Sequence, residues 1–152
     1  MQLARFTTNF TESYRKEINA KIRHSSGRGK TILLIDDEEM VINISEMMLR
    51  KIGYKVLKAQ NGHEGIQLFK SNKTKIDLII SDLEMPKMNG KEVLDKLREI
   101  DPQIKVLLSS GSLIDEDEQY VISEGFNGFL KKPYSMTTLC EKMSEAFCPK
   151  FH

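Results

Sequence analysis

Residues 76–90 read Ile-Asp-Leu-Ile-Ile-Ser-Asp-Leu-Glu-Met-Pro-Lys-Met-Asn-Gly, and this stretch indicates both the fold and the site. The mainly apolar run from Ile76 to Ser81 predicts a strand buried on both faces, as in a parallel sheet covered by helices. The run ends in one carboxylate, Asp82, after which Pro86 and Gly90 turn the chain. A carboxylate delivered to the C-terminal edge of a strand is presented to a ligand rather than to the core.

On both sides of this stretch, from residue 30 onward, short apolar runs alternate with segments of helical spacing. This alternation predicts an α/β fold, namely a doubly wound five-stranded parallel sheet of order 2-1-3-4-5 with helices on both faces. The second run alternates between polar and apolar residues, which favours a strand at the edge of the sheet. The expected strands cover residues 32–35, 55–59, 76–81, 104–109 and 127–130.

Apolar residues at spacings of three and four predict the helices between these strands. The spacing in the first helix predicts a buried face made of Met40, Val41, Ile44, Met47, Met48 and Ile52. The later helices are expected around residues 66–69, 93–97, 120–121 and 139–147. In the last of these, Cys140 is expected in the core, and Cys148 is expected to be a free thiol. Neither lies in a Cys/His cluster of the kind that binds zinc.

The N-terminal segment differs in charge from the rest of the chain. Residues 1–28 hold six Lys or Arg against two Asp or Glu, and the remaining residues hold 17 against 20. We therefore predict a basic tail or linker at 1–29 and one domain at 30–148. Two alternatives remain for the tail, a disordered linker or an amphipathic helix. The helix would place on one face the apolar residues Leu3, Phe6, Phe10, Tyr14, Ile18 and Ile22.

The bulk composition excludes several classes of function. A formal net charge of +1 argues against direct binding of nucleic acid, which usually needs a strongly basic domain. No apolar run approaches the roughly 18–20 residues that span a bilayer, and the N-terminus lacks the apolar core of a signal peptide. We therefore expect a cytoplasmic protein with no direct membrane contact.

A second acidic motif, Asp36-Asp37, follows the apolar run from Thr31 to Ile35. In a doubly wound sheet, ligands bind beyond the C-terminal ends of the strands where the strand order reverses, here between strands one and three. Asp36, Asp37 and Asp82 are therefore expected to converge. Carboxylates without sulfur or imidazole suit a hard cation such as Mg²⁺, with Mn²⁺ as a substitute. The alternative is that Asp36 or Asp37 only caps the following helix.

Two further strand ends are expected at the same edge of the sheet. Strand four ends in Ser109-Ser110-Gly111, and strand five in Lys131-Lys132-Pro133. A carboxylate, a cation, a hydroxyl and an ammonium around one crevice predict a site for a phosphoryl group. The ammonium and the cation would neutralise its oxygens while the carboxylate attacks in line.

Taken together, these motifs resemble the receiver domain of two-component response regulators. The resemblance runs from about Lys30 to Phe147 and rests on motifs that occur in the family's order. They are Ile-Asp36-Asp37-Glu38, Ser81-Asp82-Leu83-Glu84-Met85-Pro86-x-Met88-x-Gly90, Ser110-Gly111 and Lys132-Pro133.

The resemblance implies that Asp82 accepts a phosphoryl group from the histidine of a sensor kinase, or of its phosphohistidine domain, with Mg²⁺ present. It implies that Asp37 and Asp82 hold the metal through carboxylates, Asp36 chiefly through water, and Glu84 through its backbone carbonyl. Lys132 would pair with the phosphoryl oxygens. Ser110 would move in to hydrogen-bond one of them.

Four further expectations accompany the resemblance. Phe129 occupies the aromatic switch position, where its ring would turn inward as Ser110 moves, although an ordinary core Phe is the alternative. The Lys132–Pro133 bond is a candidate for cis. The Glu84 side chain, at the mouth of the site, is hypothesised to alter the hydrolysis of phospho-Asp82. Phosphorylation would change the face formed by the fourth helix, fifth strand and fifth helix after residue 30, through which a homodimer is a fair expectation.

Several readings of function remain open. The chain is interpreted as a signalling domain rather than an enzyme, catalysing only its own phosphorylation and dephosphorylation. It would be a free-standing receiver, or the C-terminal receiver of a hybrid sensor kinase, which the segments 27–34, 108–111 and 132–134 resemble. A docking module without phosphorylation is an alternative. A phosphatase of the haloacid dehalogenase type is a remote one, since its nucleophile lies on strand one.

Overall fold

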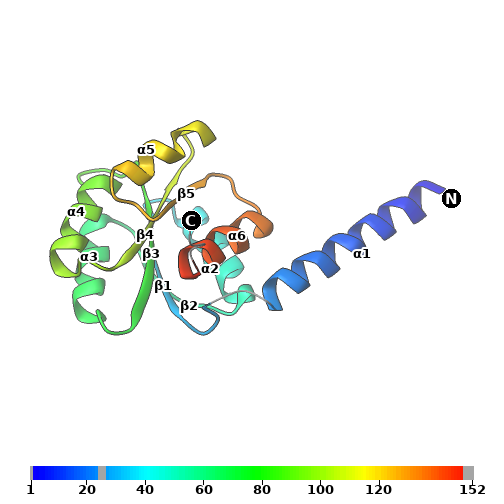
Figure 1. The fold of residues 1–152 in the computed structure, drawn as a ribbon, viewed down its shortest axis with the longest axis horizontal. Helices are drawn as coiled ribbons and strands as arrows, with labels where there is room; N and C mark the ends of the chain where they lie inside the picture. The colour runs from blue at the N-terminus through cyan, green and yellow to red at the C-terminus, as the bar shows by residue number, and fades with distance from the viewer. Residues whose placement is uncertain (1, 24–26, 149–152) are drawn as a thin grey trace.

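The computed structural model describes residues 2–23 and 27–148, which contain a five-stranded parallel sheet with helices on both faces (Figure 1). The strand order is β2-β1-β3-β4-β5, which confirms the predicted doubly wound topology and places β2 at an edge. Every expected strand is present, with bounds within one residue of those predicted. The strands are β1 (Thr31–Ile35), β2 (Lys55–Ala59), β3 (Ile76–Asp82), β4 (Lys105–Ser110) and β5 (Gly128–Lys131).

The helices divide between the two faces of the sheet. α2 (Glu39–Ile52) and α6 (Met136–Phe147) pack on one face, and α3 (Gly62–Ser71) and α4 (Gly90–Ile100) pack on the other (Figure 1). The 3₁₀ turn η1 (Asp115–Asp117) leads into the short helix α5 (Glu118–Ser123). The central strands are buried between two apolar layers, so their C-terminal ends are held rigidly at one edge.

The prediction for the buried face of α2 is correct for Ile52, and Met48 packs partly against the core, but it is wrong for Met40, Ile44 and Met47. The helix buries Ile42, Ser45, Leu49 and Ile52, whereas the side chains of Met40, Ile44 and Met47 are 76%, 52% and 72% exposed. The sequence carries two stripes at helical spacing, and the one with more apolar residues is not the one that faces the sheet. The buried stripe contains a serine because Ser45 forms a 2.6 Å hydrogen bond with the Tyr134 hydroxyl. An exposed Met/Ile surface on α2 is the consequence.

The turn between β3 and α4 is fixed by local chemistry. Asn89 caps α4 in a capping box with Glu92, in which each side chain accepts from the backbone N–H of the other residue. A Cβ atom at Gly90 would lie 2.6 Å from the backbone oxygen of Asp82. Glycine is therefore required for α4 to begin directly against the end of β3. The close approach of Gly90 places the start of α4 beside Asp82 at the sheet edge.

The N-terminal segment forms a helix, α1 (Gln2–Arg23), that extends away from the sheet and helices (Figure 1). Its last turns contact α6, where Lys21 Nζ lies 2.9 Å from Glu141 Oε1 and Ile18 packs against the core. Tyr14 is exposed. The other side chains of the predicted apolar face, Leu3, Phe6, Phe10 and Ile22, lie outside the described residues, as do residues 24–26 of the segment that joins α1 to β1. Among the described helices, none is long and apolar enough to span a membrane.

Candidate phosphoacceptor site

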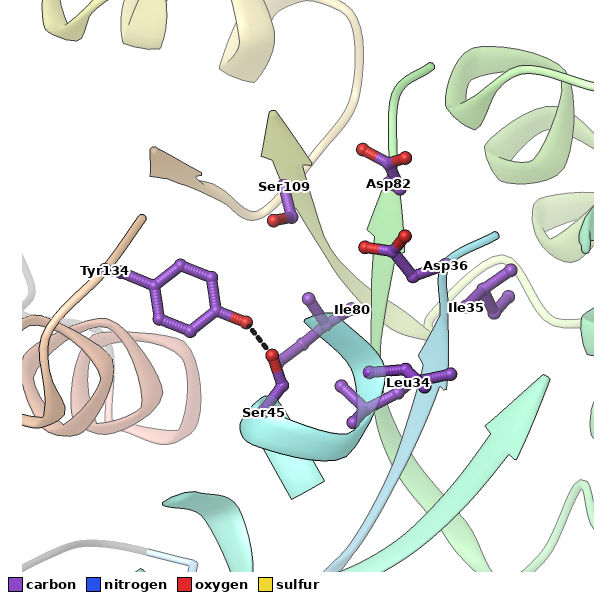
Figure 2. A pocket seen from close by; sticks show the side chains of 9 residues that line it. Leu34, Ile35, Asp36, Ser45, Ile80, Asp82, Ser109 and Tyr134 are labelled. Carbon is purple, nitrogen blue, oxygen red and sulfur yellow. Dashed lines mark hydrogen bonds between the residues drawn. The ribbon is translucent and has the colours of Figure 1, made fainter. Parts of the chain in front are cut away.

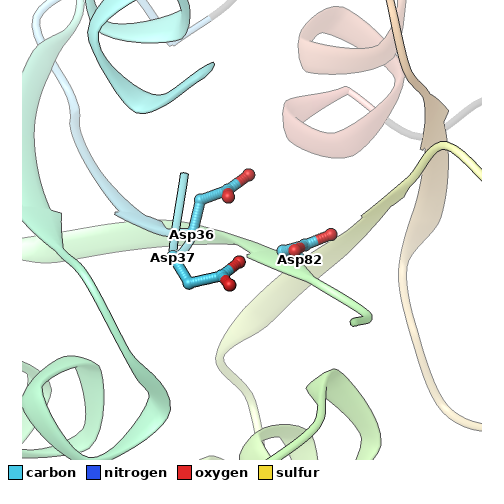
Figure 3. Close-up of side chains that lie close together, drawn as sticks. All are labelled: Asp36, Asp37 and Asp82. Atoms are coloured by element: carbon cyan, nitrogen blue, oxygen red, sulfur yellow. The ribbon is translucent and has the colours of Figure 1, made fainter. Parts of the chain in front are cut away.

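Three carboxylates meet at the C-terminal edge of the sheet, between β1 and β3. Asp36 and Asp37 follow β1, and Asp82 ends β3 (Figure 3). One carboxylate oxygen from each lies within 4.8 Å of those of the other two. Asp36 and Asp82 are buried and Asp37 is exposed, so the cluster has one side open to solvent. Asp36 also accepts a 2.9 Å hydrogen bond from the Glu38 backbone N–H, a contact near the start of α2.

Lys132 brings a cation to two of these carboxylates. Its Nζ lies 2.6 Å from Asp36 Oδ2 and 3.1 Å from Asp82 Oδ1. The Lys132 side chain is only 14% exposed, and the Asp36 and Asp82 side chains are 8% and 5% exposed. Burial alone would lower the pKa of Lys132, but the contacts with Asp36 and Asp82 outweigh it and raise this pKa above 10.5. Lys132 is therefore charged at neutral pH.

The environment of Asp82 opposes its ionisation. Burial raises the pKa of Asp82 to about 6, and repulsion from the Asp36 and Asp37 carboxylates adds to the rise, while Lys132 acts against it. One ammonium does not offset burial and two neighbouring carboxylates. Three carboxylates face one ammonium, so the site can accept a further cation. Oxygen donors without sulfur or imidazole are the donor set that suits a hard ion such as Mg²⁺.

Ser110, the predicted hydroxyl, and Glu84, the predicted modulator of hydrolysis, lie beside this cluster and are linked through hydrogen bonds. Ser110 ends β4, and its Oγ accepts a 3.2 Å hydrogen bond from the Ser112 backbone N–H. The Ser112 hydroxyl contacts Ser110 Oγ at 3.1 Å and donates a hydrogen bond to the Glu84 carboxylate. Because Ser112 joins them, Ser110 and Glu84 belong to one chain of hydrogen bonds. Ser112 was missed in the sequence, where it follows the Ser110-Gly111 motif without a signal of its own.

A solvent-accessible cleft of about 510 Å³ lies over Asp82. Asp82, Glu84 and Lys132 line it, together with Glu38, Val41, Gly111, Ser112 and Pro133. Phe129 is a predicted site residue that lies elsewhere, since its ring is buried in the core that α3 and α4 form with the sheet. The Lys132–Pro133 peptide bond is cis, as expected.

An apolar hollow adjoins the cleft on its α2 side and was missed in the sequence. It has a volume of about 140 Å³ and is lined by Val41, Ile44, Ser45, Met48, Lys132, Pro133 and Tyr134. The exposed side chains of Met40 and Met47 belong to the same helix. Apolar side chains exposed in a group beside a polar cleft are typical of surfaces that bind another protein.

The family model described as the response regulator receiver domain matches residues 32–144. The autoinducer 1 sensor kinase/phosphatase LuxN of Vibrio campbellii is 33% identical over 121 residues, which are 80% of this chain and 14% of LuxN. The crystal structure of a response regulator receiver domain protein from Clostridium thermocellum superposes with a TM-score of 0.72 at 30% identity. That superposition covers 78% of this chain and 94% of the other.

A shorter relative matches over almost its whole length. The chemotaxis protein CheY of Thermotoga maritima is 28% identical over 118 residues, which are 77% of this chain and 97% of CheY. The chain thus spans about one seventh of LuxN and nearly all of CheY. The similarity follows one domain, which occurs within long sensor kinases and also by itself.

Proposed function

Because the chain belongs to the family of response regulator receiver domains, which are signalling domains of two-component systems, we propose that Asp82 is its phosphoacceptor. The donor is a phosphohistidine of a sensor kinase or of its phosphohistidine domain. The observation that carries the proposal is the convergence of Asp36, Asp37 and Asp82 with Lys132 at one edge of the sheet. We place the domain at residues 30–148, after a basic N-terminal segment, in the cytoplasm.

The donor atoms fit a divalent cation. In our proposal Asp37 and Asp82 would hold Mg²⁺ through their carboxylates, Asp36 through water, and Glu84 through its backbone carbonyl. The ion would supply positive charge for the oxygens of the incoming phosphoryl group. Burial is the main cause of the raised pKa of Asp82, and repulsion from Asp36 and Asp37 adds to it; a divalent ion would relieve that repulsion, which supports this assignment.

The transfer step needs one nucleophile and one leaving group. A carboxylate oxygen of Asp82 attacks phosphorus and forms a new O–P bond, while the N–P bond to the donor histidine breaks. The electron pair of that bond returns to the imidazole, which takes up a proton from solvent. The product is an acyl phosphate on Asp82 and an unphosphorylated histidine.

Two residues of the chain then respond to the phosphoryl group. Lys132 exchanges its contact with Asp82 for one with a phosphoryl oxygen. Ser110 leaves its contact with Ser112 and donates to another phosphoryl oxygen. Phe129 lies in β5, beside β4, so a shift at the end of β4 reaches its ring through the sheet. The inward movement of this ring is the proposed readout on the face formed by α5, β5 and α6.

Exposed apolar side chains on α2 and on α5 support the proposal that two different partners bind at two different faces. The α2 surface (Met40, Ile44 and Met47) adjoins the cleft and suits the phosphodonor. Tyr120, which is 62% exposed, lies on α5 and suits contact with a second copy of the chain. Docking on α2 leaves the α5–β5–α6 face available for a homodimer.

The test is intact mass after incubation of the full chain with acetyl phosphate, with and without Mg²⁺. We expect a gain of one phosphoryl group that requires Mg²⁺ and that is absent from Asp82→Asn. A gain that survives this substitution would reject Asp82 as the acceptor. No gain in any condition, together with failure to bind beryllofluoride, would favour the alternative of docking without phosphorylation.

Replacing Glu84 by Ala is expected to lengthen the lifetime of phospho-Asp82. The hydrogen bond from Ser112 holds the Glu84 carboxylate at the mouth of the cleft, where it orients water toward the phosphoryl group. We expect slowing by about tenfold, below the roughly hundredfold that a well-placed general base supplies. Loss of label from phosphorylated protein gives the lifetime. Glu38→Ala, which removes another carboxylate from the same cleft, is the control. Equal lifetimes for wild type and Glu84→Ala would dispose of this role.

A further inference from the structure

A small cavity with both polar and apolar walls lies beneath the carboxylate cluster, on the side of α2 (Figure 2). It offers about 10 Å³ to the centre of a water molecule, close to the space that one ordered water needs. The walls carry the side chains of Asp36, Asp82, Ser45, Ser109 and Tyr134, and apolar residues close the remainder, namely Leu34, Ile35, Ile42 and Ile80. Because five of its nine lining residues carry a polar group, the cavity can offer a water molecule the hydrogen-bond partners that it needs.

Ser109 is the residue that requires an explanation. It is 3% exposed, and among the side chains that the structure describes its hydroxyl is the buried polar group without a hydrogen-bond partner. In the view of Figure 2 the Ser109 side chain lies between the Tyr134 ring and the Asp36 and Asp82 carboxylates, with its hydroxyl directed to the Tyr134 side. A buried hydroxyl left without a partner destabilises a fold by about 1–3 kcal/mol.

The other polar groups around the cavity have unused hydrogen-bonding capacity. Ser45 and Tyr134 share one hydrogen bond of 2.6 Å, so one of their two hydroxyl protons remains available. The Asp36 oxygens accept from Lys132 and from the Glu38 backbone and still have free lone pairs. A water here accepts from Ser109 and from the Ser45–Tyr134 pair and donates to Asp36. These contacts match the two to four partners of a typical buried water.

We propose that this cavity is a binding site for one ordered water that joins Ser109 to the Ser45–Tyr134 pair and to Asp36. The water links β4 to α2 and to the segment that follows β5, below the carboxylates. This inference does not depend on the phosphoacceptor role of Asp82, because it concerns the resting protein alone.

Thermal unfolding of Ser109→Ala tests the proposal, because the direction of the change in melting temperature depends on whether a water is bound. If the hydroxyl holds a water, its removal breaks a hydrogen bond and strands the others, and the melting temperature falls by about 2–4 °C. If the hydroxyl is simply unpaired, its removal relieves a cost and the melting temperature rises. A rise or no change would therefore overturn the proposal. Ser81→Ala, a buried serine on β3 that does not line the cavity, shows what loss of a serine hydroxyl costs elsewhere in the sheet.

A double-mutant cycle of Ser109→Ala with Ser45→Ala tests whether the water connects these two residues. Ser109 and Ser45 share no direct hydrogen bond among the described contacts, so without a bridging water their effects on the melting temperature should add. With the water, the second substitution costs less than the first because the bridge is already lost. Additive effects would contradict the bridge. A crystal structure should show a water peak within hydrogen-bonding distance of Ser109 Oγ, and a cavity without such a peak would also refute the site.

Discussion

Replacing Lys132 by Met is expected to slow phosphorylation by acetyl phosphate by at least about a hundredfold, the range for removal of one group that stabilises transition-state charge. Met keeps most of the length of the side chain and removes the ammonium. That ammonium lies 2.6 Å from Asp36 and 3.1 Å from Asp82, which places it within reach of a phosphoryl group on Asp82. The initial rate of mass gain at saturating Mg²⁺ measures the effect.

The same substitution is expected to lower the free energy of unfolding at pH 7 by about 3 kcal/mol, because it leaves buried carboxylates without their cation. The loss should shrink below about pH 6, where Asp82 takes up a proton and no longer needs the partner. Urea unfolding of the wild type and the variant at pH 7 and pH 5 measures the loss with Asp82 ionised and with Asp82 protonated. Lys131→Met is the matched control, since Lys131 is the exposed neighbour. Equal losses for both variants would contradict a role for the buried ion pairs.

The sheet and the positions of the acidic residues were predictable because two strong local signals agree. Buried parallel strands are short apolar runs, and in a doubly wound sheet their C-terminal ends meet at one edge. Placing Asp36, Asp37 and Asp82 therefore needed only the strand order, which the alternation with helices supplied. The cluster follows from topology and needs no knowledge of side-chain packing.

The face of α2 was not predictable in the same way. Counting apolar residues favoured the stripe with Met40, Ile44 and Met47, but Ile42, Leu49 and a serine face the sheet. Burial of Ser45 depends on Tyr134, which lies 89 residues away in the sequence, and periodicity carries no information about such a partner. The pairing of Lys132 with Asp36 and the contact of Glu84 with Ser112 are likewise products of tertiary packing.

All three missed contacts concern polar groups whose partners are distant in sequence. A lone serine within an apolar stripe is a weak signal, because serine is common on exposed faces as well as in helix caps. Here Ser45 lines both the small cavity beneath the carboxylates and the apolar hollow beside the cleft. Because α2 turns Ser45 toward the sheet, the Met/Ile stripe of the same helix is left exposed. Packing of α2 does not require that surface to be apolar, which supports its proposed role in docking the phosphodonor.

Replacing Asp82 by Asn is expected to stabilise the protein in EDTA at pH 8 while abolishing phosphorylation. The rise of the Asp82 pKa from its ordinary 3.8 to about 6 means that the folded state resists ionisation of this group. In the unfolded chain the carboxyl ionises near 3.8, so folding is penalised progressively as pH rises from about 4 to 6, and fully above that. The penalty corresponds to about 3 kcal/mol as an upper value. Asparagine keeps the shape and removes the charge.

We therefore expect Asp82→Asn to gain about 1–3 kcal/mol at pH 8 and nothing at pH 4. The gain is reduced because the introduced amide accepts only a neutral hydrogen bond from Lys132. Urea unfolding across this pH range measures it, with Asp37→Asn as the control because Asp37 is the exposed member of the cluster. Added Mg²⁺ should stabilise the wild type more than Asp82→Asn and so narrow the difference. A variant less stable than wild type at pH 8 without metal would contradict the repulsion argument. A gain that persists at pH 4 would assign the effect to packing, since the charge on Asp82 is then absent from both proteins.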